Sequence, residues 1–242
     1  SVLGAEAIYN FLKFKIKKKF IFLNNLKSGV NKESKKKILN LVISKSGNTL
    51  ETIANLNTQK INSNYIFVTE NKNNYLRKIA EKMKCEIIEH KNYIGGRYSV
   101  FSEVGMLPAE LMGLNEKKFK QFNYLINNKK FINNLIKNVE GILQCVKKGK
   151  INSVILNYDE DSQSFFYWYQ QLVAESLGKK SKGILPIVSQ MPKDNHSVMQ
   201  LYLDGPKNNF FTFFDVFSKK SEKINNFNLL NSHSYLKNKS IN

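Results

Sequence analysis

Residues 38–49 read Ile-Leu-Asn-Leu-Val-Ile-Ser-Lys-Ser-Gly-Asn-Thr, an apolar run that passes directly into small polar residues. The apolar part, Ile38–Ile43, predicts a β-strand, and Leu50–Gln59 has the pattern of a helix. The polar part, Ser44–Thr49, therefore joins a strand to a helix N-terminus, where free N–H groups and the helix dipole attract anions. We interpret this loop as a phosphate cradle in which Gly47 permits close backbone approach. An ordinary capped turn, where Ser, Thr and Asn are common, is the alternative.

The alternation of strands and helices continues along the whole chain. In the first half we predict a helix at Asn74–Met83 and strands at Phe20–Leu23, Tyr65–Thr69 and Cys85–Ile88. In the second half we predict helices at Phe131–Lys147, Gln163–Leu177 and His196–Leu203, and strands at Ile151–Leu156, Gly183–Val188 and Phe210–Phe214. This order predicts an α/β fold with parallel sheets covered by helices on both faces. The polar, Lys-rich segment Asn115–Asn128 predicts a boundary between domains at residues 1–128 and 129–242.

Composition narrows the classes of function. No apolar run reaches about 18 residues, so we predict no membrane span. Cys85 and Cys145 lie far apart beside apolar neighbours, which favours buried thiols in a reducing cytoplasm over a disulfide. With three histidines and no CxxC motif, we predict no metal site. The net charge of +19 is nearly all lysine, as an AT-rich coding sequence would produce, so we expect no specific nucleic-acid partner. A polyanion-binding protein, the alternative, would need its lysines clustered on one face.

Two further segments carry candidate chemistry. Arg97 follows Gly95-Gly96 in a chain that otherwise uses lysine, which indicates a need for a planar guanidinium. Gln171 and Glu175 are four residues apart on a predicted helix, so an amide can orient a carboxylate that acts as a general base. His196 could move protons near neutral pH. The alternatives are a solvent-facing arginine, a surface carboxylate and a histidine that caps a turn.

Together these segments resemble the glucose-6-phosphate isomerase family of the sugar isomerase (SIS) domain superfamily. The matching pieces stand in the family's order: Ser1–Gly4, Ser44–Thr52, Gly95–Ser99, Gln171–Lys179 and His196–Pro206. The resemblance implies two SIS domains of flavodoxin-like topology that interconvert glucose 6-phosphate and fructose 6-phosphate in glycolysis and gluconeogenesis, without metal or cofactor. A phosphosugar-binding SIS module without catalysis, such as a regulator, is the alternative.

The resemblance also implies where the hexose 6-phosphate binds. The phosphate would be held by Ser44, Ser46 and Thr49, with Lys45 nearby. Gly96 would allow the substrate to approach the backbone closely.

For the chemistry, the resemblance implies Glu175 as the base that moves a proton between C1 and C2. Arg97 would stabilise the cis-enediolate, and Gln171 would contact the substrate. His196 would assist ring opening from the neighbouring subunit of a homodimer, and Glu51 would set its tautomer.

The resemblance departs from the family pattern at both ends. Residues 1–4 look like the family's first glycine-rich loop, so the strand before it is expected to be missing from the first domain. The second domain is expected to lack a C-terminal block that carries an active-site glutamine and lysine. We therefore predict that both SIS domains are incomplete in this chain.

Overall fold

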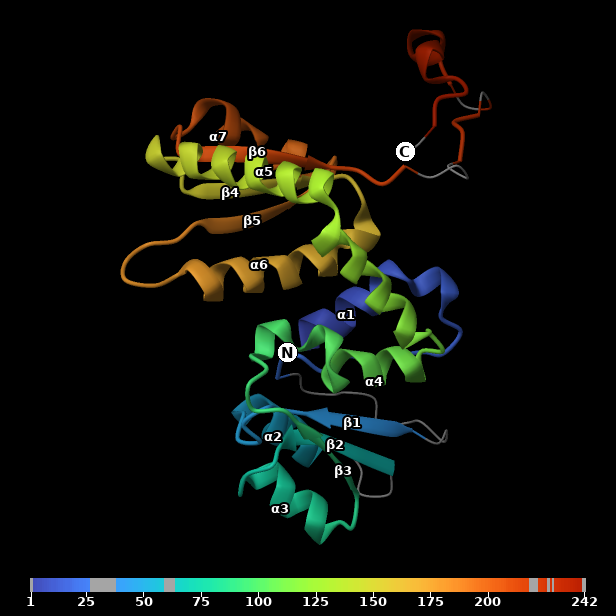
Figure 1. The fold of residues 1–242 in the computed structure, drawn as a ribbon. Helices are drawn as coiled ribbons and strands as arrows, with labels where there is room; N and C mark the ends of the chain where they lie inside the picture. Colours follow the sequence, from blue (N-terminus) through green and yellow to red (C-terminus); the bar gives the residue numbers. More distant parts are fainter. Residues whose placement is uncertain are drawn as a thin grey trace.

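The structure, a computed structural model, describes residues 2–26, 38–58, 64–217, 222–225, 227 and 229–240. Ser1 and the lysine run at residues 35–37 lie outside these ranges. The described chain contains two three-stranded parallel sheets, each flanked by helices (Figure 1). The predicted α/β class is therefore confirmed.

The first sheet has the strand order β1-β2-β3, with all strands parallel. Its elements are β1 (Leu39–Ile43), α2 (Leu50–Thr58), β2 (Asn64–Glu70), α3 (Tyr75–Lys82) and β3 (Glu86–His90). Both connections step in the same direction across the sheet, and right-handed crossovers then place both helices on one face. Because the strands are parallel, the carboxyl ends of all three lie at the same end of the sheet, where the loop Ser44–Thr49 begins.

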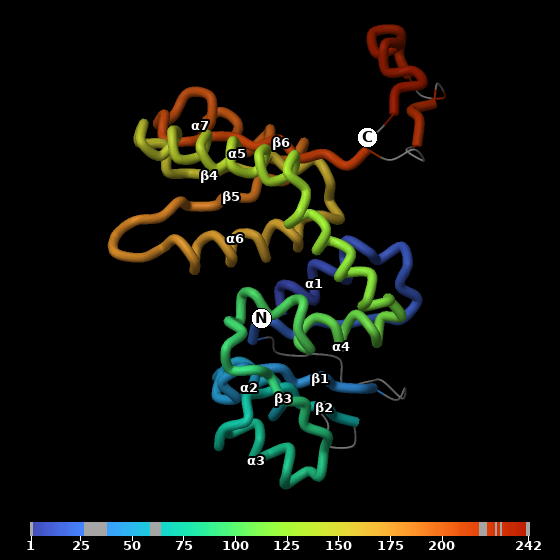
Figure 2. Tube along the Cα trace, viewed as in Figure 1, coloured from blue at the N-terminus to red at the C-terminus, as the bar shows by residue number. Residues whose placement is uncertain are grey.

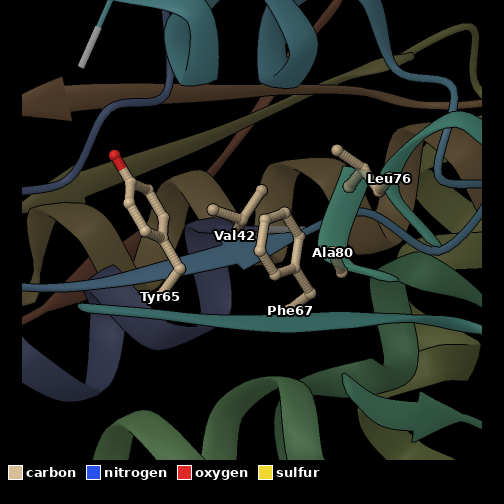
Figure 3. Close-up of a cluster of buried hydrophobic side chains, with 5 residues drawn as sticks. All are labelled: Val42, Tyr65, Phe67, Leu76 and Ala80. Atoms are coloured by element: carbon tan, nitrogen blue, oxygen red, sulfur yellow. The ribbon is translucent and has the colours of Figure 1, made fainter. Parts of the chain in front are cut away.

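A compact apolar cluster holds α3 against this sheet. Val42, Tyr65 and Phe67 contribute from β1 and β2, and Leu76 and Ala80 contribute from α3 (Figure 3). Residues of α2 pack on the same cluster, which confirms that both helices cover one face. Because Phe67, Leu76 and Ala80 are fully buried, this core fixes the strand ends that carry the polar loops.

The second sheet has the order β5-β4-β6, again parallel. Its elements are β4 (Asn152–Asn157), α6 (Gln163–Leu177), β5 (Leu185–Gln190), α7 (Met199–Asp204) and β6 (Asn209–Phe214). The chain steps from β4 to β5 and then back across β4 to β6, so α6 and α7 lie on opposite faces, as Figure 1 shows. The free face of α6 is thereby turned toward the first half of the chain.

Helices α1 (Val2–Phe11) and α4 (Glu103–Leu111) lie between α6 and the first sheet (Figure 1). α1 packs against both α4 and α6, and Asn10 Nδ2 donates a hydrogen bond to Ser164 Oγ on α6 at 2.6 Å. Val2–Gly4, expected in a loop, instead form the first turn of α1, and a Cβ at Gly4 would lie 2.8 Å from Val100 Cβ. The expectation of a loop there was wrong: the glycine is needed for close packing against Val100 within a helix.

The chain passes from α4 through a 3₁₀ segment, η3 (Glu116–Asn127), into the long helix α5 (Lys129–Lys147) and the second sheet (Figure 2). The remaining 3₁₀ segments are η1 (Lys13–Lys15), η2 (Gly96–Phe101), η4 (Glu160–Ser162), η5 (Lys193–His196) and η6 (Asn231–Leu236). Among the described helices, none combines the length and apolar character needed to cross a bilayer. The domain boundary at residues 128 and 129 stays a prediction.

Two sequence predictions were wrong in detail. Phe20–Leu23 forms no strand, because the rings of Phe20 and Phe22 pack on Tyr9 of α1, with centroids 5.7 and 5.5 Å from it. The helix predicted at His196–Leu203 is divided into η5 and α7. Between the two, the N–H groups of Ser197 and Val198 both donate to the Asp194 carbonyl oxygen, at 3.3 and 3.0 Å, so the chain turns there before α7 begins.

Candidate active site

The loop Ser44–Thr49 connects the carboxyl end of β1 to α2, as predicted. Ser44 is buried, and its Oγ lies 2.7 Å from Thr49 Oγ1 and accepts a hydrogen bond from Gly47 N at 3.2 Å. Ser46 and Thr49 are exposed beside the N-terminus of α2. The loop thus closes on itself through Ser44 and presents two hydroxyl-bearing residues where the helix dipole favours an anion.

Asn74, which the sequence analysis did not identify, supports this loop from the start of α3. Its Oδ1 caps α3 by accepting a hydrogen bond from Arg77 N at 2.9 Å, and its Nδ2 donates to Thr69 Oγ1 at 3.1 Å. Gly47 has φ +66°, and a Cβ there would lie 2.0 Å from Asn74 Oδ1. The loop therefore requires glycine at position 47 for two independent reasons. The signal that could have identified Asn74 is its helix-capping position.

Lys45 contacts protein groups that sequence reasoning did not anticipate. Its Nζ donates hydrogen bonds to the carbonyl oxygens of Asn92 at 2.8 Å and Ile94 at 2.7 Å, and it lies 3.4 Å from Glu70 Oε1. Asn92 and Ile94 belong to the segment that leads to Gly95-Gly96-Arg97. Lys45 therefore ties the serine loop to the loop that carries Arg97.

Glu70 is a carboxylate of this region that pairs with two lysines. It is buried, and Lys72 Nζ lies 2.8 Å from its Oε2. Hydrogen bonding from Lys72, followed by that from Lys45, outweighs burial and lowers the pKa of Glu70. A pocket of about 240 Å³ opens beside it, and its lining consists of Glu70, Asn71, Lys72, Glu89, His90, Lys91 and Asn92.

Arg97 and Glu175 meet although 78 residues separate them in the sequence. Arg97 Nη1 lies 3.5 Å from Glu175 Oε2. Gln171 Nε2 donates a hydrogen bond to the other carboxylate oxygen, Glu175 Oε1, at 2.8 Å, as expected for residues one helical turn apart. The Glu175 side chain is still 48% exposed, so an amide and a guanidinium orient a carboxylate that remains accessible.

Three residues that sequence reasoning did not assign also contact Arg97. Ser176 Oγ accepts a hydrogen bond from Arg97 Nε at 2.9 Å and lies 2.8 Å from Tyr98 Oη. The Arg97 guanidinium lies 4.6 Å from the centroid of the Tyr98 ring, and Trp168 Nε1 donates to the Arg97 carbonyl at 3.1 Å. Trp168, Glu175 and Ser176 all belong to α6, so this helix positions the whole arginine.

These contacts shift the pKa values of Arg97 and Tyr98. Hydrogen bonding with Tyr98, followed by that with Glu175, raises the pKa of Arg97 despite the opposing effect of partial burial. Hydrogen bonding from Ser176, and then from Arg97, lowers the pKa of the Tyr98 hydroxyl. A guanidinium is cationic at any physiological pH, and the contacts with Ser176 and Tyr98 hold that of Arg97 beside α6.

His196 and Glu51 do not join this cluster within the described part of the chain. His196 is exposed at the end of η5, and Glu51 is exposed in the first turn of α2. No hydrogen bond or ion pair links either side chain to Arg97 or Glu175 among the described residues. The predicted contact between Glu51 and His196 across two subunits stays a prediction.

The second sheet explains why His196 and Glu175 are separated. The segment after β5 lies at the carboxyl edge of this sheet, where Asn157 Nδ2 donates to Gln190 Oε1 at 3.0 Å. Helix α6 starts from the same edge at Gln163 and runs back along the sheet (Figure 1). Glu175 is twelve residues further on, which corresponds to about 18 Å at 1.5 Å per residue. The two side chains therefore lie toward opposite ends of α6 in one subunit.

His90 is a buried histidine for which sequence analysis proposed no role. It is 1% exposed, its Nδ1 contacts the Glu103 carboxylate, and its Nε2 donates to the Ile94 carbonyl at 3.2 Å, since a carbonyl oxygen can only accept. His90 and Lys45 thus bind the same carbonyl oxygen. In the described ranges, no three His, Cys, Asp or Glu side chains are grouped as metal ligands would be.

Comparisons with known sequences identify relatives over most of the chain. The profile of the phosphoglucose isomerase family matches residues 1–190, a range that ends before His196. A glucose-6-phosphate isomerase of Methanocaldococcus jannaschii is 37% identical over 186 residues, which cover 71% of this chain and 46% of that protein. A glucose-6-phosphate isomerase of Campylobacter jejuni is 32% identical over 226 residues, covering 81% of this chain and 53% of that protein. The chain thus spans about half the length of these relatives.

Solved structures show the same fold. A hypothetical protein from Thermus thermophilus has a TM-score of 0.82 at 23% identity, covering 98% of this chain and 63% of that chain. A glucose-6-phosphate isomerase from Chlamydia trachomatis has a TM-score of 0.63 at 20% identity, covering 87% of this chain and 47% of that chain. At these identities the structures support the fold alone, whereas the sequence profile and the relatives above support common descent. The chain belongs to the phosphoglucose isomerase family.

Proposed function

We propose that the protein interconverts glucose 6-phosphate and fructose 6-phosphate through a cis-enediolate, as an aldose–ketose isomerase of glycolysis and gluconeogenesis. Family membership supports this proposal, and the pairing of Arg97 with Glu175 at 3.5 Å is the observation that carries it. A carboxylate and a guanidinium from distant parts of the chain supply the two charges that an enediolate mechanism needs: a base, and a cation for the oxyanion.

The chemistry requires both groups at once. A C–H bond next to a carbonyl is too weakly acidic for a carboxylate to deprotonate in water, but a preorganised donor aimed at the developing oxyanion lowers the barrier by about 3 kcal/mol. Glu175, held by Gln171 and still accessible, takes the proton from C2 and returns it to C1. Arg97, a permanent cation held by Ser176 and Tyr98, stabilises the enediolate oxygens.

We infer that the substrate's phosphate binds at the serine loop. Ser46 and Thr49 are exposed at the N-terminus of α2, and Ser44 fixes Thr49 through their 2.7 Å contact. Lys45 adds positive charge beside them while it holds the Arg97 loop. A Cβ at Gly96 would meet no atom within 4 Å, which supports the idea that a ligand can approach the backbone at Gly96.

We further infer a two-fold homodimer in which His196 completes the site of the neighbouring subunit. The exposure of His196 and its place at the other end of α6 from Glu175 support donation across an interface. There it would move protons during ring opening, with Glu51 setting its tautomer. The free thiols Cys85 and Cys145 suit the cytoplasm, where these sugar phosphates are metabolised.

The test is an assay of the full-length gene product with glucose 6-phosphate in the presence of EDTA. We expect fructose 6-phosphate to form and the chelator to have no effect. Calorimetry with glucose 6-phosphate accompanies the assay. Binding without turnover would replace the proposal with a phosphosugar-binding module or regulator. Absence of both binding and turnover would contradict any phosphosugar function.

A further inference from the structure

Ser176 lies at the centre of the contacts that hold Arg97. Its Oγ accepts the Nε–H of Arg97 at 2.9 Å and lies 2.8 Å from Tyr98 Oη. The Tyr98 ring lies beneath the same guanidinium, with its centroid 4.6 Å away. A planar guanidinium that is bonded at Nε and stacked on one face has a fixed orientation, so its Nη groups point in one direction.

The position of the Nε bond matters for the neighbouring carboxylate. An arginine and a carboxylate readily form two parallel hydrogen bonds, often through Nε and one Nη. Ser176 occupies Nε, and the contact between Arg97 and Glu175 is a single one of 3.5 Å. Without the serine hydroxyl, Nε is free to bind the carboxylate in the paired arrangement. Such a pair would make the carboxylate a weaker base and turn the guanidinium away from a substrate.

We propose that Ser176, supported by Tyr98, is a positioning residue that orients Arg97 and keeps Glu175 from closing into a two-bond ion pair. The inference rests on the isomerase function proposed above. Ser176 acts through Arg97 rather than on the substrate, so its loss should affect the rate of proton transfer more than substrate binding. Misplacement of a catalytic group by about 1 Å can cost on the order of 100-fold in rate.

The test uses Ser176→Ala in the full-length protein, with Ser164→Ala as the matched control. Ser164 lies on the same helix and accepts its own hydrogen bond from Asn10 at 2.6 Å, but it does not contact Arg97. We expect Ser176→Ala to lower kcat roughly 10- to 100-fold with KM changed by less than about threefold. Ser176→Thr, which keeps a hydroxyl, should restore most of kcat, and Ser164→Ala should match the unsubstituted protein.

Tyr98→Phe provides a second variant that keeps the ring under Arg97 and removes only the hydroxyl, so it should lower kcat by a smaller factor than Ser176→Ala. The inference would be overturned by any of three results. These are an unchanged kcat in Ser176→Ala, equal losses of kcat in Ser176→Ala and Ser164→Ala, and a kcat in Ser176→Thr as low as in Ser176→Ala. If Ser176→Ala does not fold, unchanged kcat in Tyr98→Phe overturns it. Absence of isomerase activity in the unsubstituted protein would instead overturn the proposed function, and the two failures are therefore distinguishable.

Discussion

The ammonium group of Lys45 donates a hydrogen bond to the carbonyl oxygen of Ile94 at 2.7 Å, which joins the serine loop to the segment that carries Arg97. The same ammonium binds the Asn92 carbonyl and lies near Glu70. One side chain thus connects the proposed phosphate site with the proposed site of chemistry. This contact links the two proposed sites, and removing the charge of Lys45 tests how much it contributes to stability.

Replacing Lys45 with methionine should destabilise the protein by about 1 to 3 kcal/mol, because the Asn92 carbonyl oxygen loses its lysine donor and the buried Glu70 loses one of its two lysines. The Ile94 carbonyl oxygen keeps only its bond from His90. Lys72→Met is the control, since Lys72 also pairs with Glu70 but is 64% exposed. Its loss should cost at most about 1 kcal/mol. Urea unfolding of both variants measures the difference, and equal losses would show that the carbonyl contacts of Lys45 contribute nothing.

Gly47→Ala should distort the serine loop. A residue with a side chain at φ +66° costs roughly 1 to 2 kcal/mol, and the overlap with Asn74 should add roughly another 1 to 3 kcal/mol. Gly113→Ala is the control, because Gly113 has φ +82° but its Cβ would meet nothing within 4 Å. We expect Gly47→Ala to be the less stable variant in urea and to bind inorganic phosphate more weakly by calorimetry. Equal stability of the two variants would mean that the Asn74 side chain moves aside without a loss of folding stability.

The pKa of Glu70 predicts a dependence of stability on pH. Because Lys72 and Lys45 hold this pKa below its ordinary value of 4.5, Glu70 binds a proton more readily in the unfolded chain. Its stabilising effect is therefore complete above pH 4.5 and is lost as the pH falls through the lower pKa of the folded state. The difference in urea midpoint between the unsubstituted protein and Glu70→Gln should be larger at pH 6 than at pH 3. A difference that does not change with pH would contradict this.

Mixing two inactive variants tests whether His196 is donated across an interface. A dimer of one Glu175→Gln subunit and one His196→Ala subunit contains one intact site only if each site combines residues of both subunits. Random reassociation should then restore about a quarter of the unsubstituted activity, since half of the dimers are mixed and each has one intact site of two. No recovery in a mixture that is shown to exchange subunits would place both residues in the same subunit's site.

The sequence predicted most of the fold because its apolar runs and helical patterns are local. β1, β2 and β3 were each predicted to within about two residues, and Phe67 and Leu76 lie at buried positions of their predicted elements. The segment Phe20–Leu23 failed because aromatic residues suit any half-buried surface, and here that surface is Tyr9.

The site was less predictable than the fold. The contact of Gln171 with Glu175 follows from helical spacing, but no local pattern predicts that Glu175 meets Arg97. That expectation came from resemblance to a family. Ser176 and Tyr98 belong to the matching segments but were assigned no role, because single hydroxyl groups carry no periodic signal. Only the three-dimensional structure brings them to one guanidinium.

The central claim is that Glu175 carries a proton between C1 and C2 of a hexose 6-phosphate. The most direct measurement is the exchange of deuterium from C2 of glucose 6-phosphate into water, followed by NMR, with Glu140→Gln as the control for an exposed helical glutamate. We expect exchange with the unsubstituted protein and with Glu140→Gln, and none with Glu175→Gln, which should still bind inorganic phosphate. Exchange at the unsubstituted rate in Glu175→Gln would contradict the account.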